Sequence, residues 1–185
     1  MVLYTMVVLA YCAGLRRGEL AGLDLGDLDL QSGTITIRET KFYKTRILPL
    51  TESVVAELRA YIDARRRAGA PQDPQSGFFW HEHFNDRYTP VSVSTMITRV
   101  MRRAGFKLPT GRVGPRVHDL RHSMVVNRIL QWYRSGVNPQ YKLRFLSTYM
   151  GHRDVNSTLV YITVTQDLLQ EASERFRTVG AGCLT

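Results

Sequence analysis

The sequence predicts an α+β protein that is mainly α-helical, with a small antiparallel β-hairpin at one edge. Apolar residues recur at helical spacing over most of the chain, which is typical of amphipathic helices. One stretch, "GTITIRETKFYKTRILPL", instead alternates apolar and polar residues on either side of a polar segment, as a hairpin does. With 44% hydrophobic residues in a length of 185, the chain can bury one substantial core, which predicts a single domain over 1–185.

The opening run "MVLYTMVVLAYCAG" is apolar enough to imitate a signal peptide. It has no basic residue before its apolar run, and the bulky Tyr11 precedes Cys12 where a processing site would need a small residue. The run of about 14 residues is also shorter than the roughly 18 that span a bilayer. It therefore predicts a buried helix that enters the domain.

The next segments predict a short helix, the hairpin and a longer helix. After Gly14, residues 14–25 place Leu20 and Leu23 on one helix face, so Arg16 lies at a junction between two helices. The hairpin has Ile35 and Ile37 in its first strand, a basic tip at 39–45, and apolar residues again from Ile47. The longer helix is expected over 51–69, with Thr51 as its N-cap.

A Pro- and Gly-rich connection at 70–90 follows and contains the cluster Phe78, Phe79 and Trp80. The remaining helical patterns lie at 92–104, 119–135, 139–150, 154–161 and 165–177. The last is amphipathic, so it can pack on a neighbouring subunit and serve assembly, or pack equally well on its own domain.

The charge balance favours a polyanionic partner. Lys and Arg number 25 against 16 Asp and Glu, a formal net charge of +9, which favours nucleic acid before a membrane surface. Cys12 and Cys183 are too few for a disulfide framework and fit a reducing cytoplasmic compartment. Seven further basic residues are candidates for contact with a nucleic-acid backbone, although each can also belong to a solvated helix face. They are Arg65, Arg66, Arg67, Arg99, Arg102, Arg103 and Lys107.

The tripeptide "HEH" raises the possibility of a zinc site. His81 and His83 would share a face of an extended segment. A protein zinc site needs at least three ligands, and no third ligand follows at suitable spacing. A surface loop is the favoured interpretation.

Four further motifs each have an ordinary structural explanation when taken alone. In "VHDLRHSMV", His118 and Arg121 are three residues apart and can hold one anion from the same side of a helix, or can be a capping histidine and a solvated arginine. "GLRRGEL" can be a helix start and "TKFYKTR" a polar hairpin tip. In "YMGHRDVNSTLVYI", a tyrosine lies nine residues after a Gly-His pair and is by default a half-buried core aromatic.

Taken together and in this order, the motifs resemble those of the tyrosine recombinases of the phage integrase family, over nearly all of residues 3–177. The resemblance implies the helical catalytic domain of these enzymes. Lys44 is an alternative to Lys41 for the hairpin lysine, and the run 131–145 lengthens the usual span between the second arginine and the Gly-His motif. The implied catalytic residues are Arg16, Lys41, His118, Arg121, His152 and Tyr161.

The resemblance also implies roles for these residues. Arg16 and Arg121 would meet the charge on the phosphate oxygens through paired N–H donors, and His152 would add a third hydrogen bond. His118 would accept the proton of the Tyr161 nucleophile.

The remaining residues would support these groups. Lys41 would protonate the departing 5′ oxygen. Glu19 would orient Arg16 through an ion pair, and His122 and Ser123 would be structural.

The expected function is that of a site-specific recombinase or integrase, which cuts and rejoins double-stranded DNA through a 3′-phosphotyrosine without metal, ATP or other cofactor. The resemblance further implies a cytoplasmic, nucleoid-associated homo-oligomer with no membrane partner, which is a tetramer on DNA and can be a monomer in solution. The family's N-terminal DNA-clamping domain is expected to be absent from 1–185. Two alternatives stay open: a type IB topoisomerase-like nicking and resealing enzyme, and a DNA-binding module without catalysis.

Overall fold

The computed structural model describes residues 1–38 and 45–152. The chain divides into two compact units, Met1–Arg121 and His122–Thr185, and the second is described as far as His152. The expectation of a single domain over 1–185 stays a prediction.

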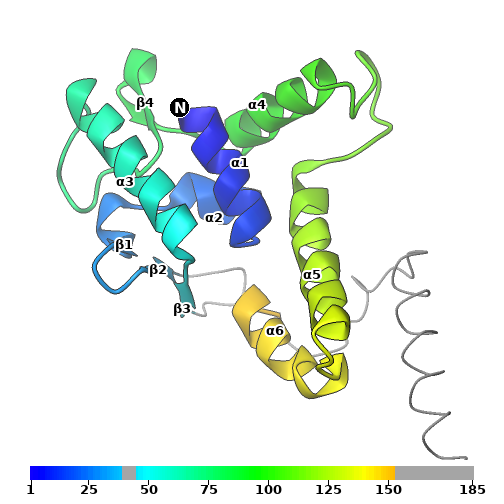
Figure 1. Cartoon of the computed structure of the whole chain (residues 1–185). Helices are drawn as coiled ribbons and strands as arrows, with labels where there is room; N and C mark the ends of the chain where they lie inside the picture. The colour runs from blue at the N-terminus through cyan, green and yellow to red at the C-terminus, as the bar shows by residue number, and fades with distance from the viewer. Residues whose placement is uncertain (39–44, 153–185) are drawn as a thin grey trace, which may run out of the picture. The chain divides into compact units, whose positions relative to one another are not determined.

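The first unit is built around the N-terminal helix α1 (Val2–Cys12), as the apolar opening run predicts. Met6 and Leu9 of α1 are fully buried. In Figure 1, α1 lies among three other helices of this unit, and it contacts each of them. They are α2 (Arg17–Gly22), α3 (Glu52–Arg67) and α4 (Pro90–Arg103).

The predicted hairpin is present as two strands of an antiparallel three-stranded sheet, in the order β1-β2-β3. The strands are β1 (Leu28–Asp29), β2 (Thr34–Ile37) and β3 (Arg46–Pro49), and the short helix η1 (Leu25–Asp27) precedes them. Strand β1 was not expected, because two residues are too few to produce an alternating pattern.

The register of the hairpin differs from the expectation at one residue. Ile35 pairs with Leu48, and both are buried in the core. Ile47, from which the apolar strand was expected to resume, is 66% exposed. Successive side chains of a strand point to opposite faces, so Leu48 and not Ile47 covers the core.

Helix α3 carries Val54, Val55 and Leu58 into the core, as its helical spacing predicts. Thr51 stands at its N-cap position, and among the described residues the partner of the Thr51 hydroxyl is the hydroxyl of Ser53, at 3.0 Å. The expected cap is therefore correct in position, without the expected bond to the helix backbone.

An aromatic cluster joins α3 to the connection that follows it. The ring of Tyr61 lies 5.0 Å from that of Phe78 and 5.5 Å from that of Phe79. Burial raises the pKa of Tyr61 to about 12. Beyond the cluster, two residues on each side pair as antiparallel strands β4 (Trp80–His81) and β5 (Asp86–Arg87), around the short helix η2 (Glu82–Phe84). The sequence predicted only a loop there.

The helix α5 (Val117–Arg134) begins in the first unit and continues into the second, where η3 (Pro139–Tyr141) and α6 (Leu143–Met150) follow it. The core of the second unit consists of buried apolar residues of α5 and α6: Met124, Val125, Ile129, Leu130, Leu146 and Met150. The single helix expected over 139–150 is divided at Lys142, because Pro139 opens a 3₁₀ turn that Lys142 closes by donating its N–H to the Pro139 carbonyl. The helices expected at 154–161 and 165–177 lie outside the described residues.

Within residues 1–38 and 45–152, no helix is both long and apolar enough to cross a membrane.

Candidate active site

The turn between α1 and α2 places the first arginine of the motif set. Gly14 has a φ of +65°, a conformation that a residue with a side chain rarely adopts. The chain reverses there, and the N–H of Leu15 donates to the carbonyl of Leu9 at the end of α1. Arg16 follows in extended conformation as the N-cap residue of α2.

Arg16 is held by the ion pair with Glu19 that the sequence predicted. The Nη1 of Arg16 lies 2.8 Å from Oε1 of Glu19, and the backbone N–H of Arg16 donates to Oε2 at 2.9 Å. The Arg16 side chain is 28% exposed, whereas the Glu19 carboxylate is 7% exposed. The carboxylate thus fixes both the backbone and the guanidinium of Arg16.

A second arginine, Arg46 of β3, shares the same carboxylate. Its Nη1 and Nη2 donate to the two oxygens of Glu19 at 3.1 and 2.9 Å, in a bidentate arrangement. The Arg46 side chain is 9% exposed. Sequence reasoning missed this residue, and the signal that could have found it is the pairing register, since Arg46 opens the strand opposite the predicted Ile37.

The two arginines determine the ionisation of Glu19. Burial by itself would raise the pKa of this carboxyl. The hydrogen bond and charge of Arg46, with the smaller effects of Arg16, more than offset burial and hold the pKa of Glu19 below its ordinary value. Glu19 is therefore a carboxylate at neutral pH, as its role between two guanidiniums requires.

The predicted His-x-x-Arg pair lies in the first turns of α5. Arg121 is fully buried, and its Nη1 donates to the carbonyl of Gly14 at 2.5 Å. His118 is exposed. The buried arginine therefore contacts the turn that carries Arg16, and the histidine remains accessible to a ligand.

The surroundings of His118 favour its neutral form. Desolvation is the largest cause of the lowered pKa, followed by the positive charge of Arg121. The charges of Arg116 and Arg16 act in the same direction, and the carboxylate of Asp119 opposes them. A neutral imidazole can accept a proton at physiological pH.

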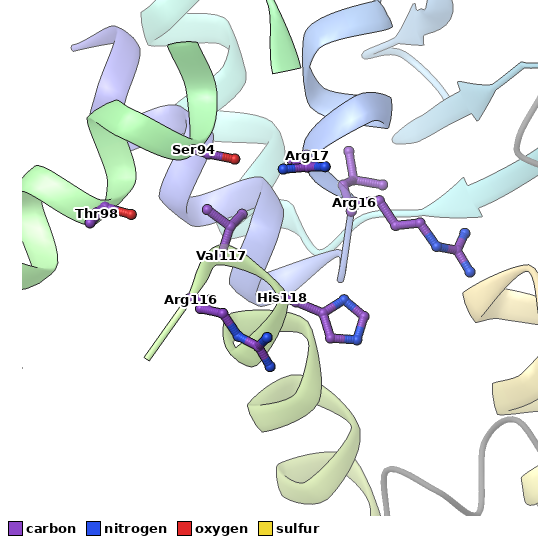
Figure 2. A pocket seen from close by; sticks show the side chains of 8 residues that line it. Arg16, Arg17, Ser94, Thr98, Arg116, Val117 and His118 are labelled. Carbon is purple, nitrogen blue, oxygen red and sulfur yellow. The ribbon is translucent and has the colours of Figure 1, made fainter. Parts of the chain in front are cut away.

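Arg16 and His118 line one cavity of about 460 Å³. Figure 2 shows Arg16 and Arg17 entering it from the start of α2 and His118 from the start of α5. The other lining residues are Leu15, Ser94, Thr98, Arg116 and Val117. The cavity thus gathers three arginines and a histidine from segments about 100 residues apart in the sequence, which suits an anionic ligand.

A second cavity of about 430 Å³ lies on the side of Arg16 that faces the sheet. Its lining includes Glu19 and Asp27 and the residues Thr36 and Ile37 of β2. Strand β2 leads directly from this cavity into residues 39–44, which contain Lys41 and Lys44 and lie outside the described part of the chain.

The loop before α5 is organised by a buried lysine. Lys107 is 7% exposed, and its Nζ lies 3.0 to 3.3 Å from four backbone carbonyls. An ammonium has three N–H donors, so at least one is shared between two acceptors. The four carbonyls belong to Arg112, Val113, Gly114 and Pro115.

Two of the basic residues proposed to contact a nucleic-acid backbone are therefore structural. Lys107 donates to the carbonyls of its own loop. Arg65 is 4% exposed and donates to Ser76 Oγ at 2.8 Å and to the carbonyls of Gly77 and Pro71. Buried charged groups need such partners, and a helical pattern cannot reveal them. For the others in that set, contact with a nucleic acid stays a prediction.

The possible zinc ligands are placed within an aromatic cluster. The His81 ring lies 4.6 Å from that of Phe84, 4.8 Å from that of Tyr88 and 6.4 Å from that of His83. In the described part of the chain, no group of three or more His, Cys, Asp or Glu side chains is placed to hold a metal ion.

The other predicted site residues belong to other parts of the chain. His152 is the last described residue and lies in the second unit, where it follows Gly151 at the end of α6 and donates its N–H to the carbonyl of Ser147 at 3.0 Å. Lys41 and Tyr161 lie outside the described residues. The structure thus brings together Arg16, His118 and Arg121.

Comparison with known protein families shows to which family the chain belongs. The profile of the "Phage integrase family" matches residues 1–167. The chain belongs to the phage integrase family. Its fold agrees, since the "Crystal structure of XerA recombinase" is 26% identical and matches 95% of this chain and 58% of that chain with a TM-score of 0.76.

Curated relatives carry recombinase names. The chain is 35% identical over 172 residues to "Putative integrase/recombinase y4rB" of Sinorhizobium fredii (strain NBRC 101917 / NGR234), which covers 93% of this chain and 54% of that protein. It is 28% identical over 177 residues to "Tyrosine recombinase XerA" of Thermococcus kodakarensis, with 94% of this chain and 55% of that protein covered. The chain spans about half the length of these relatives.

Proposed function

We propose that this chain is the catalytic domain of a site-specific DNA recombinase that cuts and rejoins DNA strands through a 3′-phosphotyrosine. The observation that carries the proposal is the cavity that both Arg16 and His118 line. Glu19 orients Arg16, and the lowered pKa of His118 favours its neutral form. Membership of the phage integrase family supports it. A neighbour of the same fold, XerH, has been crystallised "bound to difH substrate".

The first step of the proposed reaction forms a bond between the Tyr161 oxygen and the scissile phosphorus and breaks the bond to the 5′ oxygen. A phenol with an ordinary pKa of about 10 is a weak nucleophile until its proton leaves, and His118 accepts that proton. Lys41 supplies a proton to the departing 5′ oxygen. The phosphate is thereby carried on tyrosine as an ester, and a 5′-hydroxyl can attack it in the reverse sense to reseal a strand.

Negative charge on the non-bridging oxygens is met by Arg16 and Arg121, with His152 as a third donor. Guanidinium groups suit this task because they present paired N–H donors to two oxygens at once. Positive charge from arginine and lysine takes the place that a divalent cation holds in other phosphoryl transfers, and energy stored in the ester makes ATP unnecessary.

The proposal also includes the partner, the oligomeric state and the cellular location of the protein. The partner is double-stranded DNA, on which the protein acts as a tetramer, within the cytoplasm and at the nucleoid.

The test is incubation with a suicide duplex that carries a nick next to the scissile phosphate, so that cleavage traps the covalent adduct. Adduct should form with the wild-type chain and be absent with Tyr161→Phe, which should still bind DNA. A wild-type chain that binds DNA without any adduct would leave a DNA-binding module as the function. Relaxation of supercoiled DNA by a monomer would favour a type IB topoisomerase-like enzyme.

The hairpin lysine is tested with a substrate in which sulfur replaces the bridging 5′ oxygen. Lys41→Ala should slow cleavage of the ordinary duplex by about 10² to 10⁴, because the alkoxide must leave unprotonated. A thiolate with a pKa of about 8.5 hardly needs a proton, so the sulfur substrate should restore cleavage. Restoration in Lys44→Ala instead would assign the acid to Lys44, and restoration in neither would remove the hairpin from the chemistry.

A further inference from the structure

The second unit contains a stretch of sequence without acidic residues. Residues 122–152 contain no Asp or Glu and four basic residues: Arg128, Arg134, Lys142 and Arg144. All four are exposed, and Lys142 and Arg144 lie together at the start of α6. The run 131–145 brings three of these four residues.

Exposed aromatic rings accompany the two cations. Tyr141 is 75% exposed and Phe145 is 56% exposed. The guanidinium of Arg144 lies 4.8 Å from the centroid of the Phe145 ring, and the ammonium of Lys142 lies 5.8 Å from it. One ring therefore holds both positive groups at the surface by cation–π attraction.

The arrangement is set by the two faces of α6. Leu146 and Met150 of this helix are buried in the core of the second unit, and Leu143 packs against it. Arg144 and Phe145 are exposed, so they are not required by that core. The two like charges beside this one ring repel each other, and an anionic partner would relieve that repulsion.

We propose that Tyr141, Lys142, Arg144 and Phe145 form a contact surface for the phosphate backbone of double-stranded DNA. Lys142 and Arg144 pair with phosphate oxygens, the Tyr141 hydroxyl donates to a phosphate, and Phe145 keeps the two cations in place. These four residues carry two positive charges and belong to a stretch of sequence without acidic residues, which suits a polyanion such as the phosphate backbone. This inference rests on the proposed function and adds to it a contact surface of this chain's own.

The test measures the salt dependence of binding between the whole chain and a duplex oligonucleotide, because each neutralised phosphate contributes about 0.9 to the slope of log affinity against log salt. Lys142→Gln/Arg144→Gln should lower the slope by about 2 and weaken binding by about tenfold or more near 0.1 M salt. Lys142→Arg/Arg144→Lys keeps both charges and should keep the slope. Phe145→Leu should also keep the slope and weaken binding by about two- to fivefold.

A matched charge control is Arg59→Gln/Arg87→Gln, in α3 and β5, which also removes two charges from the formal net charge of +9. Arg59 donates to the Leu30 carbonyl at 2.8 Å, and Nη1 of Arg87 lies 3.0 Å from Oδ1 of Asp24, so both have partners within the protein. This variant should retain the wild-type slope. An equal loss of slope in this control would show a general charge effect and overturn the proposal.

The outcomes separate this inference from the proposed function. A wild-type slope near zero would remove DNA as the partner and both proposals with it. A steep wild-type slope that Lys142→Gln/Arg144→Gln leaves unchanged would overturn the surface alone. The patch would then have to be explained by an acidic protein partner.

Discussion

Glu19 is the residue on which the geometry of the candidate site most depends, because one carboxylate is shared by Arg16 and Arg46. In Glu19→Gln the amide oxygen could accept from one guanidinium, while the amide NH₂ would face the other as a second donor. We expect a loss of about 2 to 3 kcal/mol in the free energy of unfolding, since a buried charged donor is left without its acceptor. Urea denaturation measures it.

The control for this substitution is Glu57→Gln, which removes a partly exposed carboxylate from α3. Substitutions at such positions usually change stability by no more than about 0.5 kcal/mol. Equal effects at both positions would contradict the special role of Glu19.

The same carboxyl predicts a dependence of stability on pH. Because the pKa of Glu19 is lower in the folded chain than in the unfolded one, its contribution is fully present above the unfolded value of about 4.3. It is lost as pH falls through the lower, folded pKa. The stability difference between wild type and Glu19→Gln should therefore be constant near neutrality and shrink on acidification. A difference that persists unchanged to the lowest pH at which the chain folds would contradict the lowered pKa.

His118 predicts the acid limb of the cleavage reaction. Its pKa in the free protein lies below the ordinary value of 6.5, chiefly through desolvation and the charge of Arg121. If neutral His118 accepts the Tyr161 proton, kcat/KM for adduct formation should stay level as pH falls to about 6.5 and decline only below it. In His118→Gln the limb should disappear. A wild-type decline centred above 6.5 would show that another group controls the step.

At the scale of elements, the loop between α4 and α5 depends on one ammonium group. Lys107→Met keeps most of the side-chain volume and leaves four carbonyls without their donor, which should cost about 3 kcal/mol in the free energy of unfolding. Hydrogen exchange should show earlier opening at the start of α5.

Arg112→Ala is the matched control in the same loop. Arg112 is exposed and its backbone carbonyl, which the substitution keeps, is the group that contacts Lys107. It should leave stability within about 0.5 kcal/mol of wild type. An unchanged stability in Lys107→Met would mean that the loop is held by its other contacts, among them the bond from Arg102 to the Gly111 carbonyl at 3.1 Å.

The long helices and the hairpin could be predicted because their patterns run over many residues. The apolar positions of α3, α4 and α5 repeat often enough to define a face, and α1 is apolar along nearly its whole length. The two-residue strands β1, β4 and β5 have no such repeat, and their pairing depends on partners elsewhere in the chain. Elements specified by tertiary contact were missed for that reason.

The candidate site was predictable to a similar degree. The Arg16–Glu19 ion pair could be predicted, because its two residues are three apart on one helix turn. Arg16 and His118 were singled out by the family resemblance of the motifs taken together. Arg46 was missed, and Lys107 was assigned to contact with a nucleic acid. What distinguishes both residues is their burial beside groups that a local sequence pattern does not identify. A basic residue in a sequence looks the same whether it will bind a phosphate or the chain's own carbonyls.

At the scale of the whole molecule, the chain spans about half the length of its curated relatives. Its proposed assembly on DNA can be tested with the C-terminal segment. If residues 165–177 pack on a neighbouring subunit, deleting 165–185 should leave the monomer folded and reduce the number of protomers that sediment with a duplex site. Unchanged fold and unchanged assembly after the deletion would assign that segment to its own domain.

The pairing of Ile37 with Arg46 determines where the chain can change in length. An insertion or deletion between these two residues alters only the connection and leaves Arg46 opposite its partner. A deletion within β3 would instead slip the strand by one residue, and a slip of one turns every side chain to the opposite face of the sheet. Arg46 would then point away from Glu19. Length variation before this arginine is therefore compatible with its contact to Glu19, whereas variation after it breaks that contact, a restriction that any loop graft into this hairpin must respect.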